Sequence, residues 1–250
     1  MSLEVIYVTR HGFRSNWVVE PKTGTYSTSI PSPTGIASDP ALAGYGVEQS
    51  HELSTHLQTL SPPIERFYTS PFYRCIQTIS PAVEAIAKTA SDPETCKIRG
   101  ENGVGEWYGM ARFDHPSPAT PGVLKKLFER YDETIGRALT GRMPEDTAEE
   151  DFRPFTCGVS TFVRKNKEAK VEVPAWEGPE TKIPHVEWRG GNGVGGGWEI
   201  TKSGDCSFLS GGEERGWRFS GDESFVAKAG EGPALDAGSG LGVVIEASVD

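Results

Sequence analysis

The stretch LEVIYVTRHG at residues 3–12 decides the fold that we expect of this chain. Residues 3–8 are rich in apolar and β-branched side chains, which is typical of a buried strand. This strand runs directly into Arg10, His11 and Gly12. Ligands bind at the carboxyl ends of the strands in open α/β sheets. The stretch therefore predicts an α/β domain with a ligand site where its first strand ends.

The residues at this strand end suit the binding of a phosphate group. A neutral imidazole such as that of His11 can attack phosphorus, and the guanidinium groups of Arg10 and Arg14 can hold phosphate oxygens by bidentate hydrogen bonds. The same arginines favour the neutral form of His11 by charge repulsion. Gly12 would let a phosphate approach the backbone closely. Taken alone, however, the Arg-His-Gly tripeptide fits a turn at the protein surface better.

A second stretch, FYTSPFYRCIQT at residues 67–78, predicts another site of the same kind. It reads as a strand, a Ser-Pro turn and a helix whose first turn carries Arg74. A helix N-terminus and an arginine together make a phosphate site. Two such strand ends in one α/β domain are a more specific signal than either one alone.

Three motifs together resemble the histidine phosphatase (phosphoglycerate mutase-like) superfamily, over roughly residues 3–165. They are T-R-H-G at 9–12, S-P-x-x-R-x-x-Q-T at 70–78 and G-E-W-Y-G at 105–109. The resemblance implies a three-layer α/β/α fold, phosphomonoester hydrolysis and a phosphohistidine intermediate. The last two motifs are most similar to a fungal branch that includes the 55 kDa tau subunit of transcription factor IIIC.

The resemblance also implies which residues do the chemistry. His11 matches the nucleophile, and Glu106 matches the acid that protonates the leaving oxygen. Glu101 is the fallback for that acid, and a merely solvated glutamate is the alternative for either. The phosphate ligands implied are Arg10, Arg14 and Arg74. The substrate would be a phosphorylated small molecule or a phosphoprotein, and no metal or cofactor is implied.

One part of the family pattern is missing from this chain. The resemblance requires a second histidine at the end of a central strand, where it donates to the transferring phosphoryl group. The helix that should follow is expected at 134–141, but residues 127–133 (LFERYDE) hold neither a histidine nor an apolar strand. A deletion, natural or from a gene-model error, accounts for this. A parallel sheet that loses a central strand must re-pair its neighbours, so we expect reduced stability and little or no phosphatase activity.

The remaining histidines are weaker candidates for that role. His115 stands in a loop between Asp114 and Pro116 and could reach the cleft. His185 reads as an ordinary residue of the C-terminal part. His51 and His56 fall on the helix expected at 46–60, where surface or packing roles fit them better.

The chain divides into three regions by composition. Residues 1–168 form the histidine phosphatase-like domain, which contains a loop at 18–45; the part of this loop at 21–40 borders the cleft. Residues 169–225 form a β-rich extension with strand-like stretches at 198–208 and 217–219. Residues 226–250 are a Gly/Ala-rich tail expected to be disordered. The aromatic residues of the extension either bind protein partners or pack on the main domain; they are Trp188, Trp198, Trp217 and Phe219.

Composition and charge exclude several classes of protein. The net charge of -10 disfavours direct nucleic-acid binding. No stretch reaches the roughly 18 apolar residues of a membrane span, and no signal peptide is visible. The four cysteines lack zinc-site spacing, and the glycine-rich run at 190–197 lacks the βα unit of a dinucleotide site. We therefore expect a cytoplasmic or nuclear protein, active as a phosphatase if at all; the alternative is a non-catalytic assembly subunit in a polymerase III factor-type complex.

Overall fold

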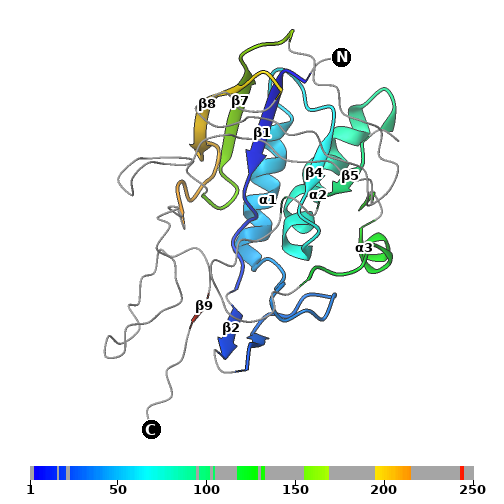
Figure 1. The fold of residues 1–250 in the computed structure, drawn as a ribbon, viewed down its shortest axis with the longest axis vertical. Helices are drawn as coiled ribbons and strands as arrows, with labels where there is room; N and C mark the ends of the chain where they lie inside the picture. Colours follow the sequence, from blue (N-terminus) through cyan, green and yellow to red (C-terminus); the bar gives the residue numbers. More distant parts are fainter. Residues whose placement is uncertain are drawn as a thin grey trace.

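The computed structural model describes residues 3–15, 17–20, 23–93, 96–101, 104, 117–128, 131–132, 155–168, 195–214 and 243–244. This part of the chain is a mixed α/β structure whose strands form three small sheets (Figure 1). Several residues singled out from the sequence lie outside it: Glu106, His115, His185, Trp188, Trp217, Phe219 and the helix expected at 134–141. Within the described part, no helix is both long and apolar enough to cross a bilayer.

The first sheet contains the strand that opens the chain. Its order is β1-β7-β8, and both pairings are antiparallel. The bounds are β1 Val5–Thr9, β7 Val159–Arg164 and β8 Trp198–Asp205. The β8 segment, which the sequence assigns to a separate extension, thus shares a sheet with β1. Alternation in sequence predicted that this segment is a strand, but it carried no information about the partner.

The second sheet is parallel, with the order β4-β5-β6. Its strands are β4 Phe67–Thr69, β5 Ile98–Gly100 and β6 Tyr131–Asp132. No described strand joins this sheet to β1, which is paired antiparallel with β7 instead. The segment 127–133 was expected to hold no strand, whereas β6 is a strand of two residues there, stabilised by pairing with β5 rather than by an apolar run.

The third sheet combines a hairpin in the region expected to be a loop with a short strand from the C-terminal tail. Strands β2 (Trp17–Glu20) and β3 (Thr25–Thr28) form an antiparallel hairpin, and β9 (Val243–Val244) pairs in parallel with β2. Prolines and glycines around the hairpin hide its short alternation in the sequence. The two β-branched valines of β9 are therefore paired, although the tail that contains them was expected to be disordered.

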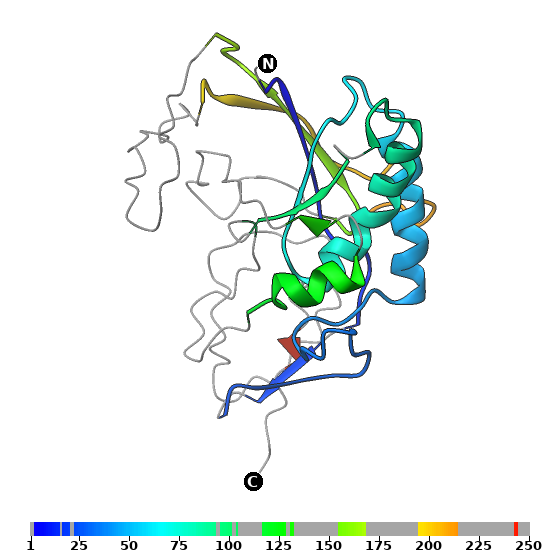
Figure 2. The same ribbon diagram turned by 90° about the vertical axis from the view of Figure 1, so that its right-hand side faces the viewer.

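Two long helices cover the strands. Helices α1 (Gly44–Leu57) and α2 (Tyr73–Thr89) pack side by side (Figure 2), and α2 also contacts β4 and β5. The short helix α3 is Pro121–Leu127. Pro81 lies inside α2, which continues past it to Thr89. The packed apolar face of this helix outweighs the single backbone hydrogen bond that a proline removes.

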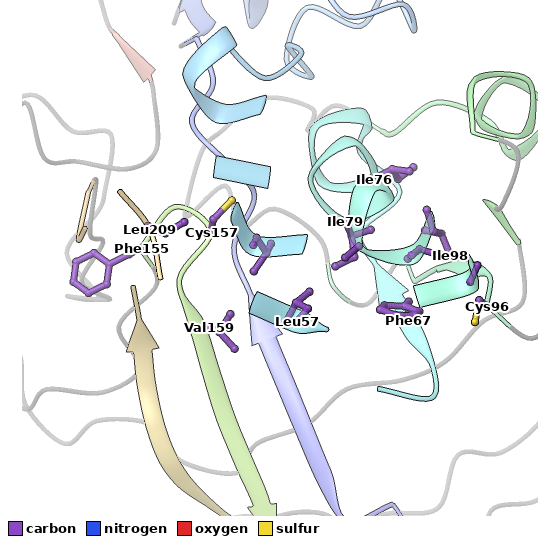
Figure 3. Packing of buried hydrophobic residues seen from close by; sticks show 14 of the residues in the cluster. Leu57, Phe67, Ile76, Ile79, Cys96, Ile98, Phe155, Cys157, Val159 and Leu209 are labelled. Carbon is purple, nitrogen blue, oxygen red and sulfur yellow. The ribbon is translucent and has the colours of Figure 1, made fainter. Parts of the chain in front are cut away.

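One hydrophobic core runs between the helices and the first two sheets (Figure 3). Leu53 of α1 and Ile76 of α2 are completely buried, and Val159 of β7 and Ile98 of β5 are nearly so. The core therefore joins the two sheets through side chains, although no described backbone hydrogen bonds connect them. This packing fixes the carboxyl end of β1 relative to the start of α2.

Candidate functional site

The loop that follows β1 is held between the two long helices. The Gly12 amide donates to Thr78 Oγ1 of α2 at 3.0 Å, and the Thr78 hydroxyl donates in turn to the Arg74 carbonyl at 2.8 Å. On the other side, the Phe13 amide donates to Gln49 Oε1 of α1 at 2.9 Å. Because the two amides that follow His11 are bonded to side chains of both helices, the position of His11 is tightly defined.

His11 is arranged as a neutral base. Its Nδ1 lies 2.8 Å from the Gly12 carbonyl oxygen. A carbonyl can only accept, so Nδ1 carries the proton and Nε2 keeps its lone pair. Burial lowers the pKa of His11 well below its usual value, and the charges of Arg14, Arg74 and Arg10 lower it further. The imidazole is therefore neutral at physiological pH, as a nucleophile must be.

Gly12 has a packing role that the sequence did not reveal. A Cβ at this position would lie 2.8 Å from the Gly46 carbonyl oxygen and 3.3 Å from Cys157 Sγ. A Cβ at Gly46 would overlap the Phe13 carbonyl. Protein atoms therefore occupy the Cβ side of Gly12, and the approach of a phosphate to its backbone stays a prediction. The two glycines let α1 approach the His11 loop closely.

Arg74 is held by a buried carboxylate that the sequence did not reveal. Asp39 Oδ1 lies 3.1 Å from Arg74 Nη1, and both side chains are at most 1% exposed. Asp39 Oδ2 also accepts from the Tyr73 amide at 2.6 Å, and Oδ1 accepts from the Arg74 amide at 3.4 Å. The amino end of α2 is thus occupied by Asp39, so the expectation that this helix end binds a phosphate directly is wrong. The helix instead contributes the Arg74 side chain to the group of arginines around His11.

Burial sets the charge balance of this pair. Desolvation raises the pKa of Asp39, and Arg74 with the two amides opposes that rise. Arg74 Nη1 also donates to the Ser38 carbonyl at 3.2 Å. No pattern in the sequence distinguishes Asp39 from the other polar residues of its loop. The only available signal was that long loops in compact domains often carry function.

A tryptophan joins the two buried arginines. The Arg14 Cζ lies 4.0 Å from the centroid of the Trp17 ring, and the Arg74 Cζ lies 5.2 Å from it. Trp17 is 1% exposed and Arg14 is 3% exposed. A guanidinium within about 6 Å of an indole is attracted by the negative face of the ring. Trp17 therefore brings Arg14 and Arg74 together despite their mutual repulsion.

The remaining described candidates are Glu101, His51 and His56, and their surroundings differ. Glu101 is buried just after β5, and its amide donates to the Thr69 carbonyl at 2.8 Å. His51 is exposed on α1, and His56 stacks on Phe208 with ring centroids 4.0 Å apart. Among the described histidines, only His11 belongs to the arginine cluster. Among the described residues, no three His, Cys, Asp or Glu side chains are grouped as a metal ion would require.

The lowered pKa of His11 predicts a loss of stability in acid. An unfolded histidine takes up a proton near its ordinary pKa of about 6.5, whereas folded His11 does so only at lower pH. The unfolded state therefore binds more protons as pH falls below 6.5, and stability falls with it. A His11→Gln variant should lose less unfolding free energy between pH 7.5 and 5.5 than the wild type does.

Chemical denaturation at the two pH values measures this difference. His51→Gln, on the exposed face of α1, is the matched control and should follow the wild type. If His11→Gln and the wild type lose equal unfolding free energy between pH 7.5 and 5.5, the lowered pKa of His11 is contradicted.

The geometry defines an α/β protein with a neutral histidine held among arginines at the end of its first strand. Residues 6–149 match the sequence profile of the histidine phosphatase superfamily (branch 1), and the chain belongs to this superfamily. Described site residues from this region include His11, Arg14, Asp39 and Arg74.

The chain is similar to a transcription factor subunit and to a phosphatase. The chain is 38% identical over 171 residues to the transcription factor tau 55 kDa subunit of Saccharomyces cerevisiae, covering 66% of this chain and 35% of that protein. It is 32% identical over 165 residues to the ecdysteroid-phosphate phosphatase of Drosophila melanogaster, covering 57% and 21%. The chain thus spans about a third or less of each relative. A crystal structure of the Bombix mori ecdysone phosphate phosphatase with tungstate matches at a TM-score of 0.39 and 20% identity, over 54% of this chain and 57% of that one.

Proposed function

We propose that the cluster around His11 binds a phosphate group and that His11 Nε2 accepts the phosphoryl group from a phosphomonoester. The supporting observation is the combination of a fixed neutral tautomer with Arg10, Arg14 and Arg74 close enough to lower the pKa of His11. The Nε2–P bond would form as the ester P–O bond breaks. The leaving oxygen would take a proton from Glu106, or from Glu101 as the fallback, and water would later hydrolyse the phosphohistidine.

Turnover by this chain is proposed to be weak. The proposed phosphate-binding side chains come from the loop after β1 and from α2, whereas the family pattern takes its second histidine from a later central strand. Residues 127–133 contain no histidine. A missing donor of this kind typically costs a few kcal/mol of transition-state stabilisation. The chain is therefore proposed to bind phosphate while transferring it slowly.

Binding of orthovanadate, an analogue of phosphate, tests this proposal without requiring turnover. Titration calorimetry should show binding by the wild type and at least a tenfold weaker affinity for His11→Ala and for Arg74→Met. His51→Ala, a histidine exposed on α1, is the matched control and should bind as the wild type does. Absence of vanadate binding by the folded wild type, or binding unaffected by both site substitutions, would overturn the proposal. Robust hydrolysis of p-nitrophenyl phosphate that is abolished by His11→Ala would instead overturn the proposal that turnover is weak.

A second candidate is a non-catalytic assembly subunit that acts in the nucleus. The identity of 38% to the transcription factor tau 55 kDa subunit favours it, because a scaffold needs the fold but not the second histidine. Protein partners would bind through the region after residue 168. Co-purification of the tagged chain with polymerase III factors, lost on removing residues 215–250, would support this role. Its absence under gentle extraction would count against it.

A further inference from the structure

The segment Cys206–Glu214, here called the strap, lies along one face of α1. Phe208 stacks on His56 with the ring planes 4° apart, and the Ser210 amide donates to Glu52 Oε2 at 3.1 Å. Cys206 and Leu209 of the strap join the hydrophobic core (Figure 3). The contacted side chains are spaced by three or four residues, as expected for one helix face; from the carboxyl to the amino end of α1 they are His56, Glu52, Gln49 and Tyr45.

The strap ends beside the His11 loop. Gln49, which is completely buried, donates from Nε2 to Glu214 Oε2 at 3.4 Å and accepts at Oε1 from the Phe13 amide at 2.9 Å. The Tyr45 hydroxyl hydrogen-bonds the Glu214 carboxylate, and the Tyr45 ring meets the Phe13 ring edge-on at 5.7 Å. One carboxylate therefore contacts both α1 side chains that touch Phe13.

The strap also reaches the other side of His11. The Thr156 amide donates to the Glu214 carbonyl at 3.2 Å, and Gln49 Nε2 donates to Thr156 Oγ1 at 3.3 Å. Thr156 forms a β-bridge with Arg10, and the Cys157 amide donates to the Arg10 carbonyl at 3.3 Å. Glu214 is thus linked to the residue before His11 through Thr156 and to Phe13 through Gln49.

We propose that Glu214 is a positioning residue that sets the His11 loop through the side-chain amide of Gln49. A carboxylate can only accept, so Glu214 holds Gln49 Nε2 toward itself and leaves Oε1 facing the Phe13 amide. Without that carboxylate Nε2 keeps only uncharged acceptors, Thr156 Oγ1 at 3.3 Å and the Tyr45 hydroxyl. The amide is then held less firmly and can turn to present its NH₂ group to the Phe13 N–H, which replaces a hydrogen bond by two facing donors. The inference rests on the proposed function in one respect, because it assumes that the His11 loop binds phosphate. Glu214 lies beyond residue 149, where the match to the superfamily profile ends.

Two readouts test the strap, one of which needs no ligand. The first is the hydrogen-exchange rate of the Phe13 amide, and the second is the dissociation constant for orthovanadate. Glu214→Ala should speed exchange of the Phe13 amide at least tenfold and weaken vanadate binding about tenfold. Glu214→Gln retains an acceptor and should stay within threefold of the wild type in both.

A variant at the far end of the strap separates positioning from general stability. His56→Ala removes the stack on Phe208 and should lower the melting temperature while leaving Phe13 exchange and vanadate affinity within twofold of the wild type. The inference is overturned if Glu214→Ala keeps wild-type exchange at Phe13, or if His56→Ala speeds that exchange as much as Glu214→Ala does. Failure of the folded wild type to bind vanadate would overturn the proposed function instead, and the exchange rates would still decide the role of Glu214.

Discussion

An Asp39→Ala variant is expected to lose about 3–5 kcal/mol of unfolding free energy, the usual cost of removing one partner of a buried ion pair. The substitution leaves the Arg74 guanidinium, 1% exposed, without the carboxylate 3.1 Å away. It also removes the acceptor for the Tyr73 and Arg74 amides at the start of α2. Urea denaturation of the wild type and the variant measures the loss.

The paired substitution is the informative control. Desolvation raises the pKa of Asp39 even beside Arg74, so the ion pair does not fully offset the loss of hydration. Replacing both partners, as in Asp39→Ala with Arg74→Met, should therefore destabilise less than Asp39→Ala alone. A double variant at least as unstable as the sum of its single variants would show that the two side chains do not act as a pair. An Asp39→Ala loss below about 1 kcal/mol would contradict the expected burial cost.

Trp17→Ala is expected to have the second large effect. Truncating a buried tryptophan typically costs about 3–5 kcal/mol, and Trp17 is 1% exposed. The change also removes the ring over which Arg14 and Arg74 lie. We therefore expect weaker orthovanadate binding in addition to the loss of stability, both measurable on the same purified variant.

Trp17→Phe separates the two effects, because a phenyl ring retains a π face but fills less space. It should keep most of the vanadate affinity while losing some stability. Trp17→Leu, which has no π face, should lose affinity as well. Equal vanadate affinity in the phenylalanine and leucine variants would show that the ring acts only by filling volume.

The sequence predicted the parts of the site that depend on strand ends. The apolar run before Arg10 and the strand-turn-helix pattern around Arg74 are local signals. The core packs the two segments against common neighbours. The end of β1 and the start of α2, which follows β4, therefore lie close together. Gln77 and Thr78, read only as motif letters, are hydrogen-bond partners of the Leu42 and Gly12 amides.

The positioning residues could not be predicted in this way. Asp39 is separated from Arg74 by 35 residues, and Glu214 is separated from Gln49 by 165. A hydrogen bond over such a distance leaves no periodicity in either segment, and polar residues in loops look alike whether buried or solvated. The pairing of β8 with β7 was hidden for the same reason, because alternation shows that a segment is a strand without identifying its neighbour.

The antiparallel pairing of β1 bears on where this protein can be shortened. A fragment ending at residue 149 would retain the whole match to the superfamily profile, yet it would lose β7, the only described strand bonded to β1. The first strand would then expose the backbone groups that β7 pairs, a template for intermolecular sheets. The borders of a sequence profile and the borders of an autonomously folding unit therefore differ here, and expression trials should extend through residue 214.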